Sequence, residues 1–232
     1  MKIVITGGAD GLGKEIVGQL IALKHEVILI DKKKENIEKV SKELKIKEIY
    51  QCDITDTTQV IETTQEILKK HKKIDVLINN AGVWLDESKE TDLGKYKNLI
   101  LVNMFGTIAI TKCFLPKFLE QKRGTIININ SQAGIVPTTN SPVYSATKHG
   151  LVGFRKSIRQ ELAQNGIKFT DIHPGMIQTG LFAKAGIDFS KSTFDKYALS
   201  KETVASAVIW AIEQPADVVI PSLEIKNINE SL

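Results

Sequence analysis

Cysteine is scarce in this sequence, and its histidines show no metal-ligand spacing. The 232 residues include only Cys52, Cys113 and four scattered histidines. Two cysteines make neither a disulfide framework nor a metal cluster, and scattered histidines do not form a zinc site. We therefore predict no disulfide scaffold and no metal.

Long apolar runs and targeting signals are also missing. No run approaches the roughly 20 residues that cross a bilayer, and the N-terminal MKIVITGG has no signal-peptide pattern. We therefore expect a cytoplasmic protein with no membrane partner. The net charge is +4, and no stripe of arginine alternates with aromatic residues, which argues against nucleic-acid binding.

Repeats, low-complexity tracts and linker-like segments are absent as well. Single α/β domains reach about 250 residues. We therefore expect residues 1–232 to form one domain.

The beginning of the chain has the pattern of a dinucleotide-binding βαβ unit. An apolar run (2–6) leads into a glycine-rich turn (7–13), a helical pattern follows, and a second apolar run (26–31) ends in an acid. A helix N-terminus offers unpaired N–H groups and a positive dipole end to a pyrophosphate, and glycines let the backbone approach it closely. We predict cofactor binding here, against the alternative of a merely structural turn.

The acid at the end of the second run, Asp31, bears on the choice of cofactor. A carboxylate there accepts hydrogen bonds from both ribose hydroxyls of an adenosine and repels a 2′-phosphate, which favours NAD over NADP. Lys32, Lys33 and Lys34 follow and are able to screen the acid, although a solvated helix start explains at least two of them. We predict NAD as the preferred cofactor and leave NADP open.

Polar and small residues follow the next predicted strands. One extended run ends at Asp53, where a carboxylate is placed to meet the adenine amino group, and Asp56 fits a helix N-cap. A buried run leads into Asn-Asn-Ala-Gly (79–82), where small residues let a ring or ribose pack on the backbone. The asparagines are equally well explained as ties between neighbouring strands. A further strand (125–131) places Ser131 at its end, where ligands bind in open parallel sheets.

The stretch from Ser131 to Lys148 carries candidate acid–base chemistry. If a helix runs through Tyr144, Lys148 lies one turn later on the same face. An ammonium beside a phenol favours the phenolate, which a free tyrosine forms only near pH ~10. Ser131 is able to donate a hydrogen bond to an oxygen near the Tyr144 hydroxyl. Taken alone, the Tyr–Lys spacing is weak evidence, because such pairs are common on helix surfaces.

The remaining segments give weaker indications. Asn103 lies among apolar residues in a long helical pattern (92–121); it is either a satisfied core amide or a holder of a water or a carbonyl beside the lysine. Residues 180–200 have the weak periodicity of a lid or substrate-contacting segment. A helix (201–213) and a strand (217–221) are predicted to close the chain.

In sequence order, these residues resemble the short-chain dehydrogenase/reductase family over essentially the whole chain. The motifs that carry the resemblance are TGGADGLG (6–13), the acid at 31, CD (52–53), NNAG (79–82), VN (102–103), Ser131, YSATK (144–148) and PGMIQT (174–179). The resemblance implies an α/β fold: a single doubly wound Rossmann domain with about seven parallel strands and helices on both faces.

The resemblance also implies residue roles. Tyr144 would be the general acid/base, Lys148 would lower its pKa and hold the nicotinamide ribose, and Ser131 would orient the substrate oxygen. Asn103 would complete a proton relay through water. The implied cofactor-binding residues are Gly7, Gly11, Leu12, Gly13, Asp31, Lys32, Asp53, Ile54, Asn80, Ala81, Gly82, Tyr144, Lys148, Pro174, Gly175, Ile177 and Thr179.

Asp10 and the C-terminal region refine these expectations. Asp10 stands where NADP-preferring relatives often carry a basic residue, so it adds to the prediction of NAD. The chain ends soon after the last predicted strand, without the glycine-rich tail of many relatives. We therefore expect a homodimer through the two long helices more readily than a homotetramer.

The expected activity is that of an NAD(P)-dependent oxidoreductase that interconverts a secondary alcohol and a ketone. The alternative is a dinucleotide-binding regulatory or scaffold protein that has lost the chemistry, which the four retained catalytic residue types argue against. The substrate is expected to be a small carbonyl compound or alcohol. A 3-oxoacyl thioester, a sugar or polyol, and a simple carbonyl all stay open, and Trp84, Phe182 and Phe189 either line an apolar pocket or pack.

Overall fold

A computed structural model describes residues 1–88, 91–183 and 196–230. Seven parallel strands form one sheet in the order β3-β2-β1-β4-β5-β6-β7. Successive strands are added on one side of β1 as far as β3, and from β4 onward on its other side. Doubly wound sheets bind ligands at the point between β1 and β4 where this order reverses. The strands are β1 (Lys2–Thr6), β2 (Glu26–Asp31), β3 (Glu48–Gln51), β4 (Val76–Asn79), β5 (Gly124–Ile129), β6 (Ile167–Pro174) and β7 (Ser222–Ile225).

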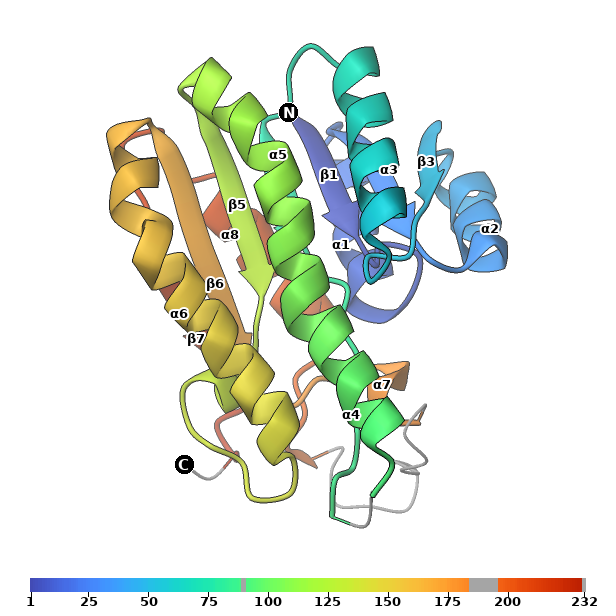
Figure 1. The fold of residues 1–232 in the computed structure, drawn as a ribbon, viewed down its shortest axis with the longest axis vertical. Coiled ribbons are helices and arrows are strands. Elements are labelled where there is room, and N and C mark those ends of the chain that lie inside the picture. The colour runs from blue at the N-terminus through green and yellow to red at the C-terminus, as the bar shows by residue number, and fades with distance from the viewer. Residues whose placement is uncertain (89–90, 184–195, 231–232) are drawn as a thin grey trace.

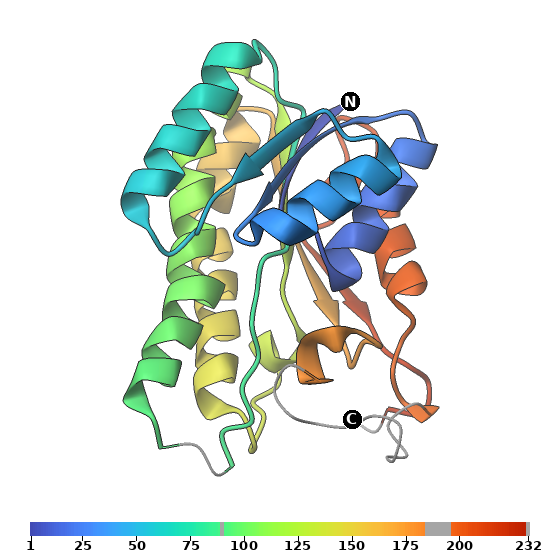
Figure 2. The ribbon, with the colours of Figure 1, turned by 90° about the vertical axis from the view of Figure 1, so that its right-hand side faces the viewer.

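Helices cover both faces of this sheet (Figures 1 and 2). One face carries α3 (Thr57–Lys70), α4 (Leu93–Ile100), the π-helical segment η1 (Leu101–Gly106), α5 (Thr107–Gln121) and α6 (Pro142–Gln164). The other face carries α1 (Gly11–Ala22), α2 (Lys34–Leu44) and α8 (Lys201–Ile212). Two short helices, η2 (Gln132–Gly134) and α7 (Gly180–Ala183), follow strands near the predicted site. The predicted α/β Rossmann fold is therefore confirmed.

The central strands are apolar on both sides because each side is covered. Ile3 and Ile5 of β1 pack with α1 and α8, whereas Val4 belongs to the cluster under α3, α5 and α6. All three side chains are fully buried. A continuous apolar run rather than an alternating one is typical of such strands.

A row of buried polar side chains crosses three neighbouring strands at one level. Asn79 donates to Asn128 (2.9 Å), which donates to Asp171 (3.1 Å), and Asp171 forms an ion pair with Arg155 of α6 (2.5 Å). The register pairs the three strand residues directly. Asn79 therefore ties strands together, which is one of the two interpretations left open by the sequence.

The last strand is not where the sequence predicted it. The β-branched run at 217–221 lies before β7 as irregular chain, and Val218 donates to the Pro215 carbonyl in a turn. Pro221 has no N–H to contribute to a sheet, and its carbonyl instead accepts the first bond from β6. Pairing with β6 therefore begins only at Ser222.

The predicted long helix at 92–121 exists as α4, η1 and α5 in succession. By length and composition alone, Leu93–Gln121 is long and apolar enough to cross a membrane. Lys97 and Lys112 interrupt its apolar residues, so a search for unbroken runs does not detect it. Its most apolar window is 44% buried, and α5 packs on the sheet as the core helices of globular proteins do (Figure 1).

Candidate active site

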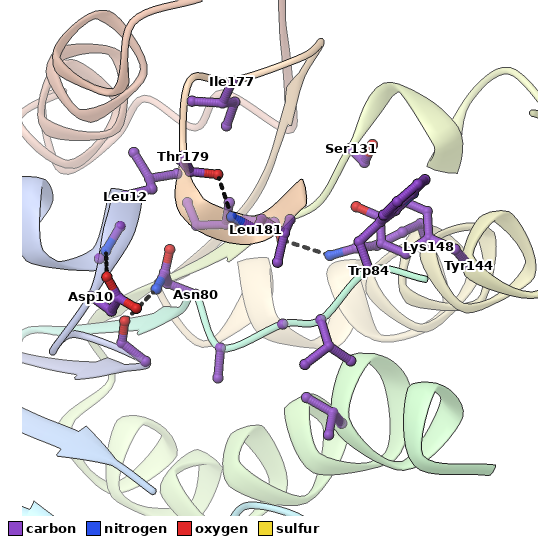
Figure 3. A pocket seen from close by; sticks show the side chains of 18 of the residues that line it. Asp10, Leu12, Asn80, Trp84, Ser131, Tyr144, Lys148, Ile177, Thr179 and Leu181 are labelled. Carbon is purple, nitrogen blue, oxygen red and sulfur yellow. Dashed lines mark hydrogen bonds between the residues drawn. The ribbon is translucent and has the colours of Figure 1, made fainter. Parts of the chain in front are cut away.

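A cavity of about 780 Å³ lies at the carboxyl ends of β1, β2, β4, β5 and β6. It extends from the glycine turn at one end to Tyr144 and Lys148 at the other (Figure 3). Every residue that the sequence predicted to bind the cofactor lines this cavity. Of the four predicted catalytic residues, Asn103 alone is not part of the lining.

The glycine turn needs glycine for two different reasons. Gly7 and Gly11 have φ values of +63° and +52°, a region that L side chains rarely adopt. Gly13 has an ordinary φ, but a Cβ there would collide with the carbonyl oxygen of Gly7. The turn thus brings β1 and α1 so close that no side chain fits between them. The first residues of α1, Gly11 to Gly13, line the cavity.

The charged groups expected near an adenosine lie beside the glycine turn, at the ends of β2 and β3. The Asp31 carboxylate accepts N–H bonds from Ala9 and Lys33, both at 3.1 Å. Lys32 forms an ion pair with Asp53 at 2.6 Å. Burial raises the pKa of Asp53, but the bonds from Lys32 and Thr55 outweigh it and hold that pKa below its usual value. Lys32 therefore has an acid partner, while its side chain stays 69% exposed.

The two asparagines of the NNAG motif have separate positions. Whereas Asn79 belongs to the buried row, Asn80 lines the cavity and its amide donates to the Gly7 carbonyl at 2.8 Å. The backbone N–H groups of Asn80 and Ala81 both lie 3.2 Å from the Thr6 hydroxyl. These contacts fasten the end of β4 to the glycine turn, so both asparagines tie neighbouring segments together. Asn80 also lines the cavity, and packing of a ring or ribose on this motif stays a prediction.

Ser131, Tyr144 and Lys148 come together at the other end of the cavity (Figure 3). Ser131 follows β5 and caps η2, with its hydroxyl accepting from Ala133 N–H at 3.1 Å. The Lys148 ammonium lies 5.6 Å from the centre of the Tyr144 ring and donates to the Ile129 carbonyl at 3.0 Å. The helix predicted through Tyr144 is α6, and it places the two side chains on one face as expected.

The electrostatics of this cluster differ from the sequence-based expectation. Burial raises the pKa of the Tyr144 phenol, and the hydrogen bond with Ser131 only partly opposes it. Burial also lowers the pKa of Lys148 to about 8, against the attraction of Asp171. The predicted fall in the Tyr144 pKa is thus absent, because removing the phenol from water disfavours its charged form more than its neighbours favour it.

Asn103 lies in η1, between α4 and α5. Its side chain donates to the Val83 carbonyl and accepts from the Val83 N–H, both at 2.8 Å, and it is 1% exposed. Both hydrogen bonds go to the loop that follows the NNAG motif. The structure therefore shows a satisfied core amide, and the water relay stays a prediction. A π-helical turn at such a position is often associated with function.

Several residues of this end were not singled out from the sequence. His173 donates from Nδ1 to the Ser131 carbonyl at 2.9 Å, and burial lowers its pKa. Met176, Asp86 and Glu230 line the cavity, and a Cβ on Gly175 would collide with the Glu230 carboxylate. Met176 lies inside the PGMIQT motif, but no local motif marks His173, Asp86 or Glu230, which come from separate segments.

The segment predicted to contact the substrate is only partly described. Trp84 lines the cavity, as does Leu181 at the start of α7. Phe182 follows in α7. Phe189 and most of the proposed lid lie outside the described residues.

The fold and this cavity define a doubly wound, dinucleotide-binding type of protein. The family model described as short chain dehydrogenase matches residues 1–188. The chain therefore belongs to the short chain dehydrogenase family, as its motifs indicated.

Curated relatives agree with this assignment. The chain is 36% identical over 195 residues to dehydrogenase/reductase SDR family member 7 of Mus musculus, of which it covers 58%. It is 30% identical to an uncharacterized oxidoreductase of Staphylococcus epidermidis over 96% of this chain and 95% of that one.

Solved structures show the same architecture over the full chain. Serine dehydrogenase from Escherichia coli superposes with a TM-score of 0.87 at 28% identity, covering 100% of both chains. A closed form of serine dehydrogenase complexed with NADP+ gives 0.90, covering 100% of this chain and 97% of the other. An actinorhodin polyketide ketoreductase with NADPH gives 0.87 at 26% identity, with 97% and 95% covered.

Proposed function

We propose that this protein is a nicotinamide-dependent oxidoreductase that interconverts a secondary alcohol and a ketone, with Tyr144 as general acid/base. One observation carries the proposal. Tyr144, Ser131 and Lys148 share a single cavity with the glycine turn, so a dinucleotide held at the turn extends toward the acid–base group. A scaffold protein of this fold has no need for that convergence.

The lining residues fit a dinucleotide. A Cβ on Gly13 would collide with the Gly7 carbonyl, whereas a Cβ on Gly11 would meet only Thr179, at 3.8 Å. The absence of side chains at both positions leaves the backbone accessible to a pyrophosphate at the start of α1. All four predicted contacts line the cavity: Asp31 and Asp53 would meet the adenosine, and Ile177 and Thr179 the nicotinamide. When bound, the cofactor supplies hydride transfer, and its oxidised ring adds a positive charge that favours the Tyr144 phenolate.

The proton chemistry belongs to the chain's own residues. Because burial raises the Tyr144 pKa, the phenol is protonated at neutral pH and suited to donate to a carbonyl oxygen. Ser131 is placed to hold that oxygen. Lys148, anchored by Ile129, is the cation that supports the phenolate once the proton has left.

The choice between NAD and NADP rests on opposing observations. The serine dehydrogenase and ketoreductase structures hold NADP+ and NADPH, which favours NADP and gives the NAD preference no support. Asp31 favours NAD, because its carboxylate stays beside the adenosine end while Lys32 is paired with Asp53. We propose a nicotinamide dinucleotide as the cofactor, with Asp31 as the residue that sets the preference.

The substrate end combines apolar and acidic groups. Trp84, Met176 and Leu181 line it together with Asp86 and Glu230. Lys148 is the one basic residue of that end within the described part of the chain, and it is committed to Tyr144 and Ile129. A neutral carbonyl compound or alcohol is therefore a better fit than an anionic one.

Turnover by a Tyr144→Phe variant tests the mechanism. A panel of carbonyls and alcohols, including ethyl acetoacetate and L-serine, is followed by nicotinamide absorbance with each cofactor. We expect the wild type to turn over and the variant to lose at least about 100-fold while it binds cofactor normally. Equal turnover by both proteins would falsify the mechanism. Cofactor binding by the wild type without turnover of any panel member would support the scaffold alternative.

We also propose a cytoplasmic homodimer. Ile100 and Phe105 are 39% and 42% exposed on the face of α4 and η1, which is the kind of apolar exposure that a second subunit covers. Light scattering measures the oligomeric state, and fractionation of cells measures the location.

A further inference from the structure

The helix that carries Tyr144 has an N-terminus that its own residues do not cap. Ser141 is its N-cap residue, but the Ser141 side chain makes no capping bond and donates instead to the Leu85 carbonyl at 3.3 Å. Pro142 has no N–H to satisfy. The first N–H groups of α6 that need a partner therefore belong to Val143 and Tyr144.

Both of these groups are satisfied by one carboxylate from a distant loop. Glu87 accepts from Val143 N–H through Oε2 and from Tyr144 N–H through Oε1, each at 2.8 Å. The Glu87 backbone N–H donates to the Asn140 carbonyl at 3.2 Å. Glu87 is 9% exposed, so a carboxylate that is normally in water is here buried on the helix terminus. Such a charge is stabilised by two N–H donors and by the positive end of the helix dipole.

The loop that contains Glu87 is also a wall of the cavity. Gly82, Val83, Trp84 and Asp86 all line it. Asn103 holds the same loop at Val83. The loop is thus fastened at one point to η1 and at another to the first turn of α6, directly at the backbone of Tyr144.

We propose that Glu87 is a positioning residue for Tyr144, and that it couples the order of the cavity-lining loop to the placement of the phenol. This inference rests on the proposed function, since it assigns Glu87 a part in the proton transfer by Tyr144. Lys148 is held separately, by the Ile129 carbonyl. Loss of Glu87 therefore frees the start of α6 while the lysine one turn later keeps its anchor.

The test compares turnover and cofactor binding in Glu87→Ala and Glu87→Gln. We expect kcat to fall about 10- to 100-fold in Glu87→Ala, because small misplacements of reacting groups have effects of that size. Cofactor affinity should stay within about twofold, since the glycine turn is untouched. Glu87→Gln keeps one acceptor oxygen and should recover part of kcat. Glu87→Gln also serves as the test if the alanine variant fails to fold.

Asp56→Ala is the matched control. Asp56 is the N-cap residue of α3 and also accepts two N–H bonds at a helix start, from Thr58 and Gln59 to its Oδ1, and it does not line the cavity. The Asp56→Ala variant should lose about as much thermal stability as Glu87→Ala, with kcat unchanged. A Glu87→Ala enzyme with wild-type kcat, or an equal loss of kcat in Asp56→Ala, overturns the inference.

Two further measurements separate the failure of this inference from failure of the proposed function. If Tyr144→Phe retains wild-type turnover, the proposed function fails. Hydrogen exchange at the Val143 and Tyr144 amides then tests, without any substrate, whether Glu87 holds the start of α6. Faster exchange at these two amides in Glu87→Ala supports the proposal that Glu87 holds the start of α6, and unchanged exchange contradicts it.

Discussion

The two ends of the cavity are built in different ways. At the glycine turn, the backbone itself forms the site: Gly7, Gly11 and Gly13 are required by positive φ or by close approach. At the Tyr144 end, side chains from separate segments form it, with Ser131, Lys148 and Glu87 each held by a residue distant in the sequence. A change at the first end should therefore affect binding, and a change at the second should affect turnover.

Replacing Lys148 by Met should have the largest effect and should separate function from stability. Turnover should fall about 10²- to 10⁴-fold, the range of acid–base catalysis. Because burial lowers the Lys148 pKa to about 8, the unfolded chain binds more protons between pH ~8 and ~10.4, the ordinary lysine value. The stability of the wild type therefore rises with pH through that window, and the penalty is fully present below it.

The methionine removes this penalty, so the variant should be more stable than the wild type at pH 7. The predicted gain is about 1–3 kcal/mol, measured by urea unfolding. The gain should shrink as the pH rises above 8. An inactive variant that is less stable at pH 7 would show that the bond to Ile129 outweighs the buried charge.

Gly13→Ala tests the backbone-built end. Its Cβ would collide with the Gly7 carbonyl, so the turn has to open. We expect cofactor affinity to fall at least about 100-fold, equivalent to ~2.7 kcal/mol, in a fluorescence titration. Gly18→Ala is the control, since nothing lies near its Cβ position in the same helix. A similar loss in both variants would contradict the geometric explanation.

Asp171→Asn tests how far the Tyr144 end depends on the buried row. It leaves Arg155 buried without its ion-pair partner, and breaking a buried pair typically costs about 3–5 kcal/mol. It also removes the attraction that raises the pKa of Lys148. That pKa should then lie lower, and the alkaline limb of the pH–rate profile should move to lower pH. A profile that does not move would show that Asp171 is purely structural.

Asp31→Ala should have the smallest effect and sharpens the cofactor assignment. Removing the carboxylate takes away the repulsion of a 2′-phosphate, and it leaves Lys32 and Lys33 beside it in the cavity lining. The affinity ratio of NADPH to NADH should rise about tenfold, or ~1.4 kcal/mol, in paired titrations at equal salt. An unchanged ratio would exclude Asp31 as the residue that sets the preference.

The contrast between the two ends also explains how well each was predicted. β1, the glycine turn, α1 and β2 are contiguous, so local periodicity located both strands at their observed bounds. The helix was placed after the turn (7–13), whereas α1 begins inside it, at Gly11. Tyr144 and Lys148 lie one helical turn apart, and that spacing was equally local. Glu87, His173 and Glu230 had no such signal, because their partners lie about 40 to 60 residues away in sequence.

Two predictions were wrong for different reasons: the position of the last strand and the direction of the Tyr144 pKa shift. For β7, the β-branched residues at 217–221 favoured a strand locally, while Pro221 and the register of β6 determined where pairing begins. For Tyr144, the lysine four residues away suggested a lowered pKa. The direction depends on burial, which is a property of the packed molecule.

The sequence alone determined the doubly wound fold, the family and the identity of the groups at each end of the cavity. Those follow from local patterns of apolar residues, glycines and motif spacing, because neighbouring residues fix one another's backbone. Only the tertiary structure decided that Glu87 caps the Tyr144 helix, that Asn103 holds Val83, and that burial raises the pKa of Tyr144 and lowers that of Lys148. Those depend on which segments meet and on how much water they exclude.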